Sequence, residues 1–357
     1  MTSPSPVGAD THLATPSGNV MDTPHAPQSP PNSDLRRDIV VIGASAGGLR
    51  VLLDLASALP AGLPAAVLMV LHVGAHRSVL PELLSKRGAI RAIHPVHGQP
   101  LLPGTIYVAP PDHHMMVEND LIQVQRGAKE HHARPAIDPL FRAAALAYGP
   151  RVIGVVLSGR LDDGTAGLQA IKRCGGLAVV QEPADAEHPD MPASALDNVA
   201  VDFCVPRERL AETLLALVNQ PAGPWPAAPA QIACEQAISI GVGNPMEHLN
   251  TIGKPSCFAC PDCDGVLWEI EASRPKRYRC HTGHGYSLRS LVHTQQMATD
   301  HALWAAIRAL QDREKLLRTL AEAGDRAGED HEAAALVAEA ERVARHSVEL
   351  QRLVSAG

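Results

Sequence analysis

The sequence predicts an α/β protein in which helices cover a doubly wound, mostly parallel sheet, followed by a small cysteine-containing ribbon and a C-terminal α-helical hairpin. Three patterns predict this fold. Continuous aliphatic runs alternate with stretches of helical periodicity between residues 38 and 218. Four of the seven cysteines fall between residues 251 and 290, and apolar heptads follow them. Aromatic residues make up only 3% of the chain, so we expect a core of Val, Leu, Ile and Ala.

The composition argues against several classes of protein. The net charge of −7 disfavours a chain that holds nucleic acid by bulk positive charge. Seven cysteines in 357 residues are too sparse for a disulfide-stapled secreted domain, and the first residues lack the pattern of a secretion signal. No run approaches the ~18 uninterrupted apolar residues of a spanning helix. We therefore expect a cytoplasmic chain that does not insert into a membrane.

The N-terminal part begins with a leader and then changes to strands and helices. Residues 1–36 are rich in Pro, Ser and Thr without apolar periodicity, which predicts a disordered leader. The run DIVVIGA at 38–44 predicts a buried strand, GLRVLLDLASAL at 48–59 a helix, and AAVLMVLHV at 65–73 a second strand. These three elements form one βαβ unit.

The same alternation continues to residue 220, so we expect residues 37–220 to form one domain. Short strands are predicted at 105–110, 113–118 and 121–125, and Asn119-Asp120 joins the last two as a hairpin. Some antiparallel strand therefore accompanies the parallel sheet. The remaining predicted elements are helices at 141–149, 164–176 and 207–220 and strands at 151–159 and 177–182.

The C-terminal part divides into three predicted segments. The run PAGPWPAAPA predicts a linker over 221–250, and a ribbon follows over 251–290. Residues 291–357 carry two apolar seams that predict a pair of antiparallel helices packed on each other. Pairing of these seams with another chain is the alternative. The seams are Leu303, Ile307, Leu310 and Leu317 in one helix, and Leu336, Ala340, Val343, Leu350 and Val354 in the other.

A serine lies in the turn between the first strand and the first helix, in the run VIGASAGG. As a dinucleotide fingerprint this run would need an acidic residue at the end of the second strand, which ends in His72 instead. As G-x-S-x-G it resembles a nucleophile elbow, with Ser45 lifted above the sheet and backbone N–H groups nearby for an oxyanion. A Gly-rich turn without chemistry is the remaining alternative.

Two other strand ends supply partners for Ser45. His72 ends the second strand, and Asp162 and Asp163 follow the strand at 151–159. Carboxyl ends of parallel strands meet at one edge, so Ser, His and Asp can form a triad there. One of the two aspartates can instead cap the next helix. The other histidines of this domain are interpreted as surface or pocket-rim residues: His76, His113, His114, His131 and His132.

These residues belong to a set of motifs that resembles the catalytic domain of the chemotaxis receptor methylesterases, the CheB-like protein-glutamate methylesterases. The resemblance covers residues 38–218 and implies a methylesterase-like fold and a Ser-His-Asp triad of Ser45, His72 and Asp163, without a catalytic cofactor. It also implies hydrolysis of glutamate γ-methyl esters, with glutamine deamidation, on methyl-accepting chemoreceptors. The motifs are VIGASAGG, VLHV, IYVAPPDHH, HARPAIDPLFRAAA, LSGRLDDGTAGL and QEPADAEHPDMPASAL.

The chain departs from this family at two places in the motifs. Ala46 stands where the family commonly has Thr, and Arg160-Leu161 stand where it commonly has Met-Gly. If this second stretch supplies a backbone N–H to the oxyanion hole, the side-chain change is tolerable, whereas an inward Arg160 would shift substrate preference. The predicted leader is also too short for the family's usual receiver domain, so the resemblance does not carry over control by a phosphorelay.

A second constellation of side chains predicts a zinc site. Cys260 and Cys263 form a C-x₂-C pair, and Cys280 and His284 follow at the spacing of a zinc ribbon. Three thiolates and one imidazole close a tetrahedral shell, which predicts a structural zinc ion. Cys257 and His281 are alternative ligands.

The sequence therefore predicts a serine esterase that acts on a chemoreceptor-like protein. The ribbon and the hairpin are predicted to regulate it or to bind a partner. The alternative is a catalytically weak signalling scaffold that binds a receptor tail or a ligand in the esterase-like pocket. The basic run at 274–279 is short and flanked by acids, so we do not expect nucleic acid as a partner. Cys174, Cys204 and Cys234 are interpreted as buried small apolar residues.

Overall fold

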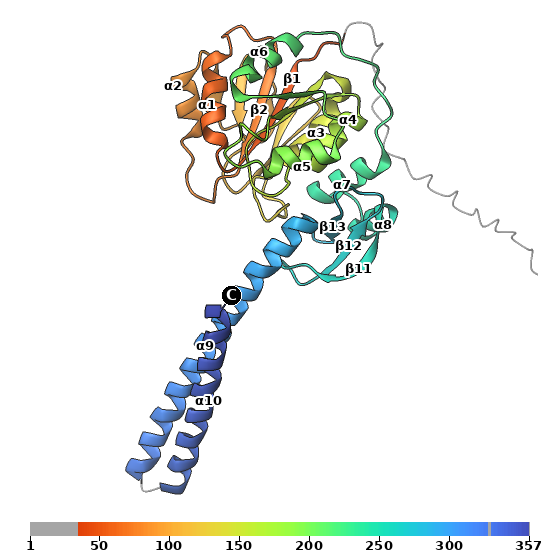
Figure 1. Cartoon of the computed structure of the whole chain (residues 1–357). Coiled ribbons are helices and arrows are strands. Elements are labelled where there is room, and N and C mark those ends of the chain that lie inside the picture. The colour runs from red at the N-terminus through yellow and green to blue at the C-terminus, as the bar shows by residue number, and fades with distance from the viewer. Residues whose placement is uncertain (1–34, 328–329, 357) are drawn as a thin grey trace, which may run out of the picture.

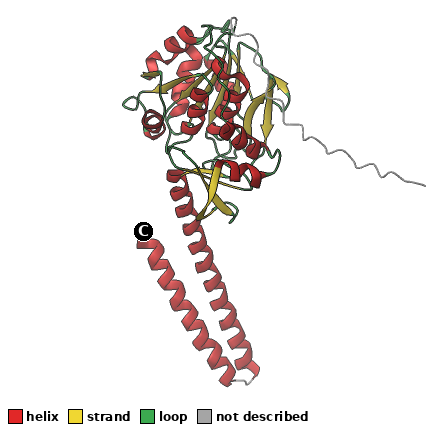
Figure 2. Cartoon of the chain, turned by 90° about the vertical axis from the view of Figure 1, so that its right-hand side faces the viewer, coloured by secondary structure: helices red, strands yellow, loops and turns green. Residues whose placement is uncertain are grey.

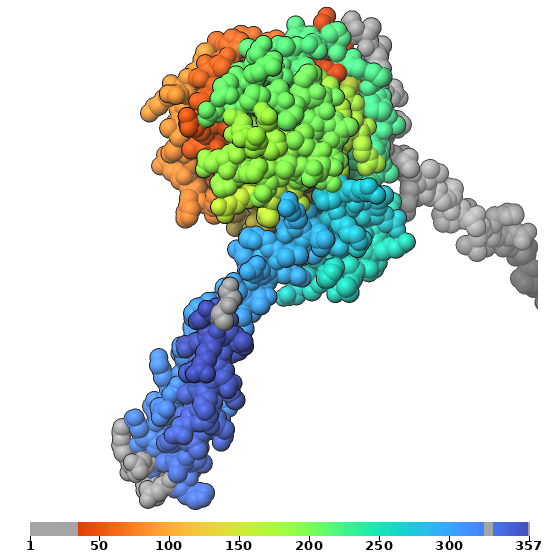
Figure 3. All heavy atoms as spheres, viewed as in Figure 1, coloured from red at the N-terminus to blue at the C-terminus, as the bar shows by residue number. Residues whose placement is uncertain are grey.

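The computed structural model describes residues 35–327 and 330–356, which excludes nearly all of the predicted leader. A globular part contains the sheet and the ribbon, and a long helical hairpin projects from it (Figures 1 and 3). Within the described ranges, no helix is both long enough and apolar enough to cross a membrane.

A seven-stranded sheet forms the centre of the globular part, and all its neighbouring strands pair in parallel. Its inner strands are fully buried aliphatic runs, as expected for a parallel sheet covered on both faces. In spatial order the strands are β10 (Phe203–Val205), β9 (Leu177–Gln181), β8 (Val152–Val156), β1 (Ile39–Ala44), β2 (Ala66–Leu71), β5 (Thr105–Val108) and β3 (Arg91–Ile93).

Helices cover both faces of this sheet, which confirms the doubly wound α/β fold (Figures 1 and 2). Alternate residues of β1 point to opposite faces: Val40 and Ile42 to one core, Ile39 and Val41 to the other. The first core includes α1 (Gly48–Ala58), α2 (Leu80–Arg87) and α6 (Arg207–Leu217). The second includes α3 (Ile137–Tyr148), which a 3₁₀ turn at Gly149–Arg151 follows, α4 (Thr165–Arg173) and α5 (Asp190–Asn198).

The predicted antiparallel strands form a separate small sheet. β6 (His114–Glu118) and β7 (Leu121–Gln125) are the expected hairpin, and β4 (Gln99–Pro100) pairs with the outer side of β7. The hairpin turn places Asn119 and Asp120 in the left-handed region, at φ 50° and 59°. Met115, Met116 and Ile122 pack this sheet onto the core that contains α3.

The segment predicted as a linker contains two helices, so that prediction is wrong for most of its length. α7 (Ala230–Ile240) and α8 (Pro245–Ile252) lie between the central domain and the ribbon. Ile232 joins the core of the central domain, whereas Ile238 packs with Leu249, Trp268 and Ile270. The Pro-rich run at 221–229 precedes these helices and obscured them, and residues 241–244 form the turn between the two helices.

The ribbon is a four-stranded antiparallel sheet, and the chain then enters the hairpin. Its strands are β11 (Gly253–Ala259), β12 (Val266–Ile270), β13 (Arg277–Cys280) and β14 (Gly285–Ser287). The hairpin consists of α9 (Leu288–Ala327) and α10 (Asp330–Ala356), which lie side by side (Figures 1 and 2). Ile307, Ala340 and Val343 are buried between them, on the seams that the heptads predicted.

Candidate active site and metal-ligand cluster

Three neighbouring strands bring the predicted triad residues to one edge of the sheet. Ser45 follows β1, His72 follows β2, and Asp163 lies in the loop between β8 and α4. The strands β8, β1 and β2 are adjacent and parallel, so their carboxyl ends meet. The chain runs from β1 to β2 on one side and returns to β8 on the other. Open α/β sheets bind their ligands at such a reversal of strand order.

A chain of hydrogen bonds joins these residues. His72 Nδ1 lies 3.1 Å from Ser45 Oγ, and His72 Nε2 lies 2.8 Å from Asp163 Oδ2. A neutral His72 with its proton on Nε2 donates to Asp163 and turns the Nδ1 lone pair toward the Ser45 hydroxyl. The His72 side chain is 20% exposed and that of Asp163 only 2%. The arrangement can therefore take a proton from Ser45 beside solvent while its carboxylate stays buried.

The turn around Ser45 depends on two close glycines. Gly47 has φ 76°, in the left-handed region, and precedes the first residue of α1. Gly159 packs against the serine, because a Cβ at this position would lie 2.8 Å from Ser45 Cβ and would also meet Met191. The Ser45 N–H donates to Ser158 O at 2.9 Å. Both backbone segments therefore hold the Ser45 side chain at the strand end.

Asp163 and Asp138 cap each other's helices. Asp163 accepts hydrogen bonds from the N–H groups of Ile137 and Asp138 in the first turn of α3. Asp138 Oδ1 accepts from the N–H groups of Gly164 and Gly167 at the start of α4. The expected cap of α4 by Asp162 or Asp163 is therefore wrong in part, since the side chain of Asp138 supplies it. This exchange fixes the carboxylate that contacts His72.

Asp163 stays ionised in this buried position. Burial alone would raise the pKa of its carboxyl group. The charge of His131 and the hydrogen bond from His72 outweigh burial, and they hold the pKa of Asp163 at about 2. Asp163 is thus a carboxylate at neutral pH and can stabilise a protonated His72.

The interpretation of five histidines as surface or rim residues is wrong for two of them. His114 is 3% exposed, and its Nε2 donates to Ala128 O at 2.9 Å. The His131 side chain is 6% exposed and its Nε2 lies 3.0 Å from Asp138 Oδ2. No local pattern marked His131, because its partners come from distant segments. His76 is exposed, and His113 and His132 are half-buried.

The basic run at 274–279 does not form an open basic surface. Arg279 is 3% exposed and donates to Glu130, at 3.1 Å to Oε1 and 2.8 Å to Oε2, inside the contact with the central domain. Arg277 pairs with the buried Glu235 at 2.6 Å. Of the three cysteines interpreted as buried, Cys174 is buried, Cys234 is half-buried and Cys204 is exposed, so the interpretation is wrong for Cys204.

The predicted metal ligands lie together at one end of the ribbon. One donor atom from each of Cys260, Cys263, Cys280 and His284 falls within a set whose members lie at most 4.8 Å apart. The Sγ atoms of Cys263 and Cys280 are 3.7 Å apart, close to the about 3.8 Å expected between two thiolates on a tetrahedral zinc ion. Cys257 and His281 are exposed and lie outside this set. Four soft or borderline donors in this geometry fit a zinc ion.

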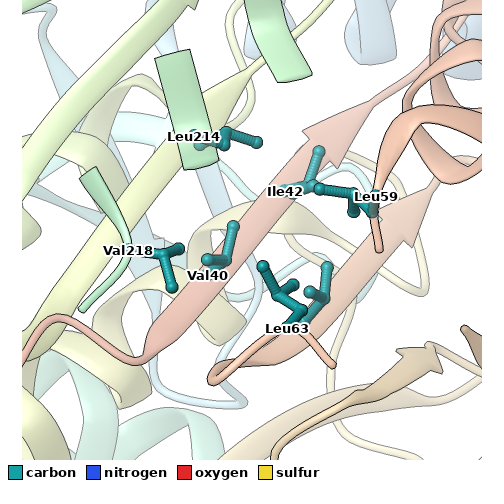
Figure 4. A pocket seen from close by; sticks show the side chains of 7 residues that line it. Val40, Ile42, Leu59, Leu63, Leu214 and Val218 are labelled. Atoms are coloured by element: carbon teal, nitrogen blue, oxygen red, sulfur yellow. The ribbon is translucent and has the colours of Figure 1, made fainter. Parts of the chain in front are cut away.

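An apolar gap in the core carries no chemistry. It lies between β1, β2 and α6, with Val40, Ile42, Leu59, Leu63, Leu214 and Val218 around it (Figure 4). Every side chain that lines it is aliphatic. The gap therefore offers no catalytic group, and the strand ends that carry Ser45 and His72 are the candidate active site.

Comparisons with known proteins identify the family of this chain. A family model described as CheB methylesterase matches residues 40–214. A Leptospira interrogans protein named putative protein-glutamate methylesterase/protein-glutamine glutaminase is 36% identical over 182 residues, which cover 50% of this chain and 94% of that protein. A Methanosarcina mazei protein-glutamate methylesterase/protein-glutamine glutaminase is 35% identical over 192 residues, which cover 51% of this chain and 52% of that protein.

A solved structure is also similar to this chain. The crystal structure of the Thermotoga maritima CheB methylesterase catalytic domain is 30% identical, with a TM-score of 0.49, and the match covers 51% of this chain and 98% of that chain. The residues that the family model matches include Ser45, His72 and Asp163, and the match with the Leptospira protein covers nearly all of that protein. This chain therefore belongs to the CheB methylesterase family.

Proposed function

We propose that this chain hydrolyses glutamate γ-methyl esters, and deamidates glutamines, on a methyl-accepting chemoreceptor or a related signalling protein. The observation that carries the proposal is the hydrogen-bonded chain from Ser45 through His72 to the buried carboxylate of Asp163. Relatives named protein-glutamate methylesterase/protein-glutamine glutaminase support the substrate class. None of the seven cysteines, all of which lie in the described residues, forms a disulfide, which is compatible with a place in the reducing cytoplasm.

In the proposed mechanism Ser45 is the nucleophile and His72 moves the proton. Ser45 Oγ attacks the ester carbonyl carbon as His72 Nδ1 takes the hydroxyl proton. The tetrahedral oxyanion collapses, and the protonated His72 returns that proton to the leaving methoxide, which departs as methanol. Water then attacks the acyl-enzyme, with His72 as base, and releases the glutamate side chain and the free Ser45. With a glutamine side chain the leaving group is ammonia.

Two backbone N–H groups beside Ser45 are our candidates for the oxyanion hole. The N–H groups of Ala46 and Arg160 donate no hydrogen bond within the described part of the chain. Arg160 follows Gly159, which packs against Ser45. The Arg160 side chain is exposed, and Leu161 has φ 66°. The departure from the family motif thus leaves the backbone at this place free to donate.

A labelling experiment tests the catalytic assignment. The full chain is treated with a fluorophosphonate, and methanol release from methylated receptor membranes is measured in parallel. We expect Ser45 to be labelled and methanol to be released, and we expect Ser45→Ala and His72→Ala to abolish both. The exposed Ser57 on α1 supplies the control Ser57→Ala, which should behave as the wild type. Absence of labelling together with unchanged receptor binding by Ser45→Ala would instead favour the weak signalling scaffold.

We also propose that Cys260, Cys263, Cys280 and His284 hold a structural zinc ion. Four protein ligands leave no open position for water, so the ion would stabilise the ribbon rather than take part in hydrolysis. Metal analysis of the purified chain should give one zinc per chain. Cys263→Ser should lose it and lower the melting temperature, whereas the matched change at the exposed Cys257 should keep it. Retention of one zinc by Cys263→Ser would contradict this ligand set.

A further inference from the structure

The loop at residues 129–133 is held between the central domain and the ribbon. The Glu130 carboxylate binds the buried guanidinium of Arg279 at 2.8 Å and that of Arg142 at 2.8 Å. The His131 N–H donates to Gly285 O at 2.7 Å. His132 lies 3.4 Å from Asp262 of the ribbon. Contacts with the ribbon on three successive residues therefore set the position of His131.

The His131 side chain points away from solvent, into a cluster of carboxylates. Its Nε2 lies 3.0 Å from Asp138 Oδ2 and 3.8 Å from Asp163 Oδ1. Its Nδ1 lies 3.1 Å from the Ser290 hydroxyl and 3.8 Å from Asp162 Oδ1. His72 and His131 therefore approach the two oxygens of the Asp163 carboxylate from different sides.

This environment favours the imidazolium form of His131. Burial alone would lower the pKa of the ring, but the carboxylates of Asp163, Asp138 and Asp162 raise it to about 10. The other ring nitrogen contacts the Ser290 hydroxyl, and the Ser287 hydroxyl donates to the Asp162 carboxylate beside it. The residue next to His131 in the chain, Glu130, pairs with Arg142 and Arg279. Both ring nitrogens then act as donors.

A metal ion is a poorer occupant of this cluster than a proton on His131. Both oxygens of Asp163 and Oδ1 of Asp138 already accept backbone N–H groups. A ligated ion would have to replace these bonds, which cap α3 and α4. The imidazolium supplies positive charge while the caps remain.

The junction between β14 and α9 closes the cluster. The Ser287 hydroxyl donates to Asp162 Oδ1 at 2.6 Å and the Ser290 hydroxyl accepts from His131 Nδ1. Both serines are buried, at 1% and 0% exposure. The carboxylate that serves His72 is thus in contact, through one histidine, with the segment where the ribbon becomes the hairpin.

We propose that His131 is a positioning residue for the Ser45–His72–Asp163 triad, and that the ribbon and α9 hold it there through Gly285 and Ser290. The proposal rests on the proposed function and adds a control point to it. The His131 ring lies against Asp163 Oδ1, and its positive charge stands across the shared carboxylate from His72. Any ligand or partner that shifts the ribbon or α9 would act on the triad through this ring.

Removal of the His131 charge tests the proposal. His131→Gln keeps an N–H donor toward Asp138 and loses the charge, whereas the matched His97→Gln lies at an exposed site. The rate of fluorophosphonate labelling of Ser45 is measured across pH. We expect the acid limb of the His131→Gln profile to move to higher pH by about half a unit or more, because loss of a nearby cation favours protonation of the base. His97→Gln should keep the wild-type profile.

A second variant keeps the His131 ring and removes its hydrogen-bond partner in α9, the Ser290 hydroxyl. Ser290→Ala should shift the acid limb in the same direction by less, whereas Ser355→Ala near the end of α10 should not. Nitrogen NMR of labelled histidines, without any substrate, should show one ring that keeps both protons above neutral pH and that is missing from His131→Gln. Wild-type pH profiles in both His131→Gln and Ser290→Ala, or a neutral His131 ring at neutral pH, would overturn the proposal. An unlabelled Ser45 in the wild type would instead count against the proposed function.

Discussion

Replacement of Asp163 by Asn removes one charge and leaves the shape of the side chain unchanged. Asp163 accepts four N–H groups: those of Asp138 and Gly164 on Oδ1, and those of Ile137 and His72 on Oδ2. An amide has one acceptor and one donor group, so it can satisfy only one of these two pairs. The favoured orientation keeps its oxygen toward Asp138 and Gly164, because the opposite one would turn the NH₂ group toward the N–H groups of both residues and toward the ring of His131, none of which can accept its protons.

In that orientation the amide NH₂ faces His72 Nε2, which must become an acceptor. The His72 proton then moves to Nδ1, 3.1 Å from Ser45 Oγ, and no base remains for the hydroxyl. The wrong tautomer in a Ser-His-Asp triad costs about four orders of magnitude in kcat, or about 5.5 kcal/mol of transition-state stabilisation. The Ile137 N–H also loses its acceptor, which lowers the free energy of unfolding by about 1–3 kcal/mol.

The assay combines fluorophosphonate labelling of Ser45 and methanol release with chemical denaturation. Asp197→Asn, an exposed change on α5, is the matched control and should alter neither rate nor stability. A folded Asp163→Asn protein that keeps more than about a tenth of the wild-type rate would refute the role of this carboxylate in setting the His72 tautomer.

Three further outcomes follow from the same contacts. Arg279→Leu leaves the buried Glu130 with one guanidinium fewer and should lower the free energy of unfolding by about 3–5 kcal/mol. Lys276→Ala breaks an exposed ion pair and should leave the urea denaturation curve close to that of the wild type. The pKa of His131 is raised from 6.5 to about 10, so its contribution to stability is complete below pH 6.5 and is lost as the pH rises toward 10. Between these values the free energy of unfolding, measured by denaturation, should fall by up to about 1.4 kcal/mol per pH unit, and His131→Gln should lack this dependence. Gly159→Ala places a methyl group against Ser45 and should lower kcat by about 10² while the protein stays folded; an unchanged rate would contradict the close approach.

Local patterns were sufficient to predict much of the fold. The aliphatic runs at β1, β2 and β8 are strands because only a sheet covered on both faces buries them fully. The heptads of α9 and α10 placed Ile307 and Val343 on the buried seam. The helices α7 and α8 were missed because the Pro-rich run before them masked their short periodicity.

Much of the candidate site could also be predicted from local patterns in the sequence. Ser45, His72 and the pair Asp162 and Asp163 were predicted from three strand ends, since parallel strands bring their carboxyl ends to one edge whatever lies between them, and the family resemblance then singled out Asp163. The ligand spacing of the ribbon was readable because a tetrahedral shell needs two pairs of donors on two turns. Neither pattern depends on how the ribbon docks on the central domain.

The sequence by itself determined the alternation of strands and helices, the residues at the strand ends and the ligand pairs of the ribbon, because each follows from a short-range period or spacing. Only the tertiary structure decided which histidines are buried, that Arg279 binds Glu130, and that Asp138 and Asp163 cap each other's helices. These contacts join residues far apart in the sequence or in separate elements. The charge of a buried group is set by such neighbours in space, so His131 could be recognised only after the chain had folded.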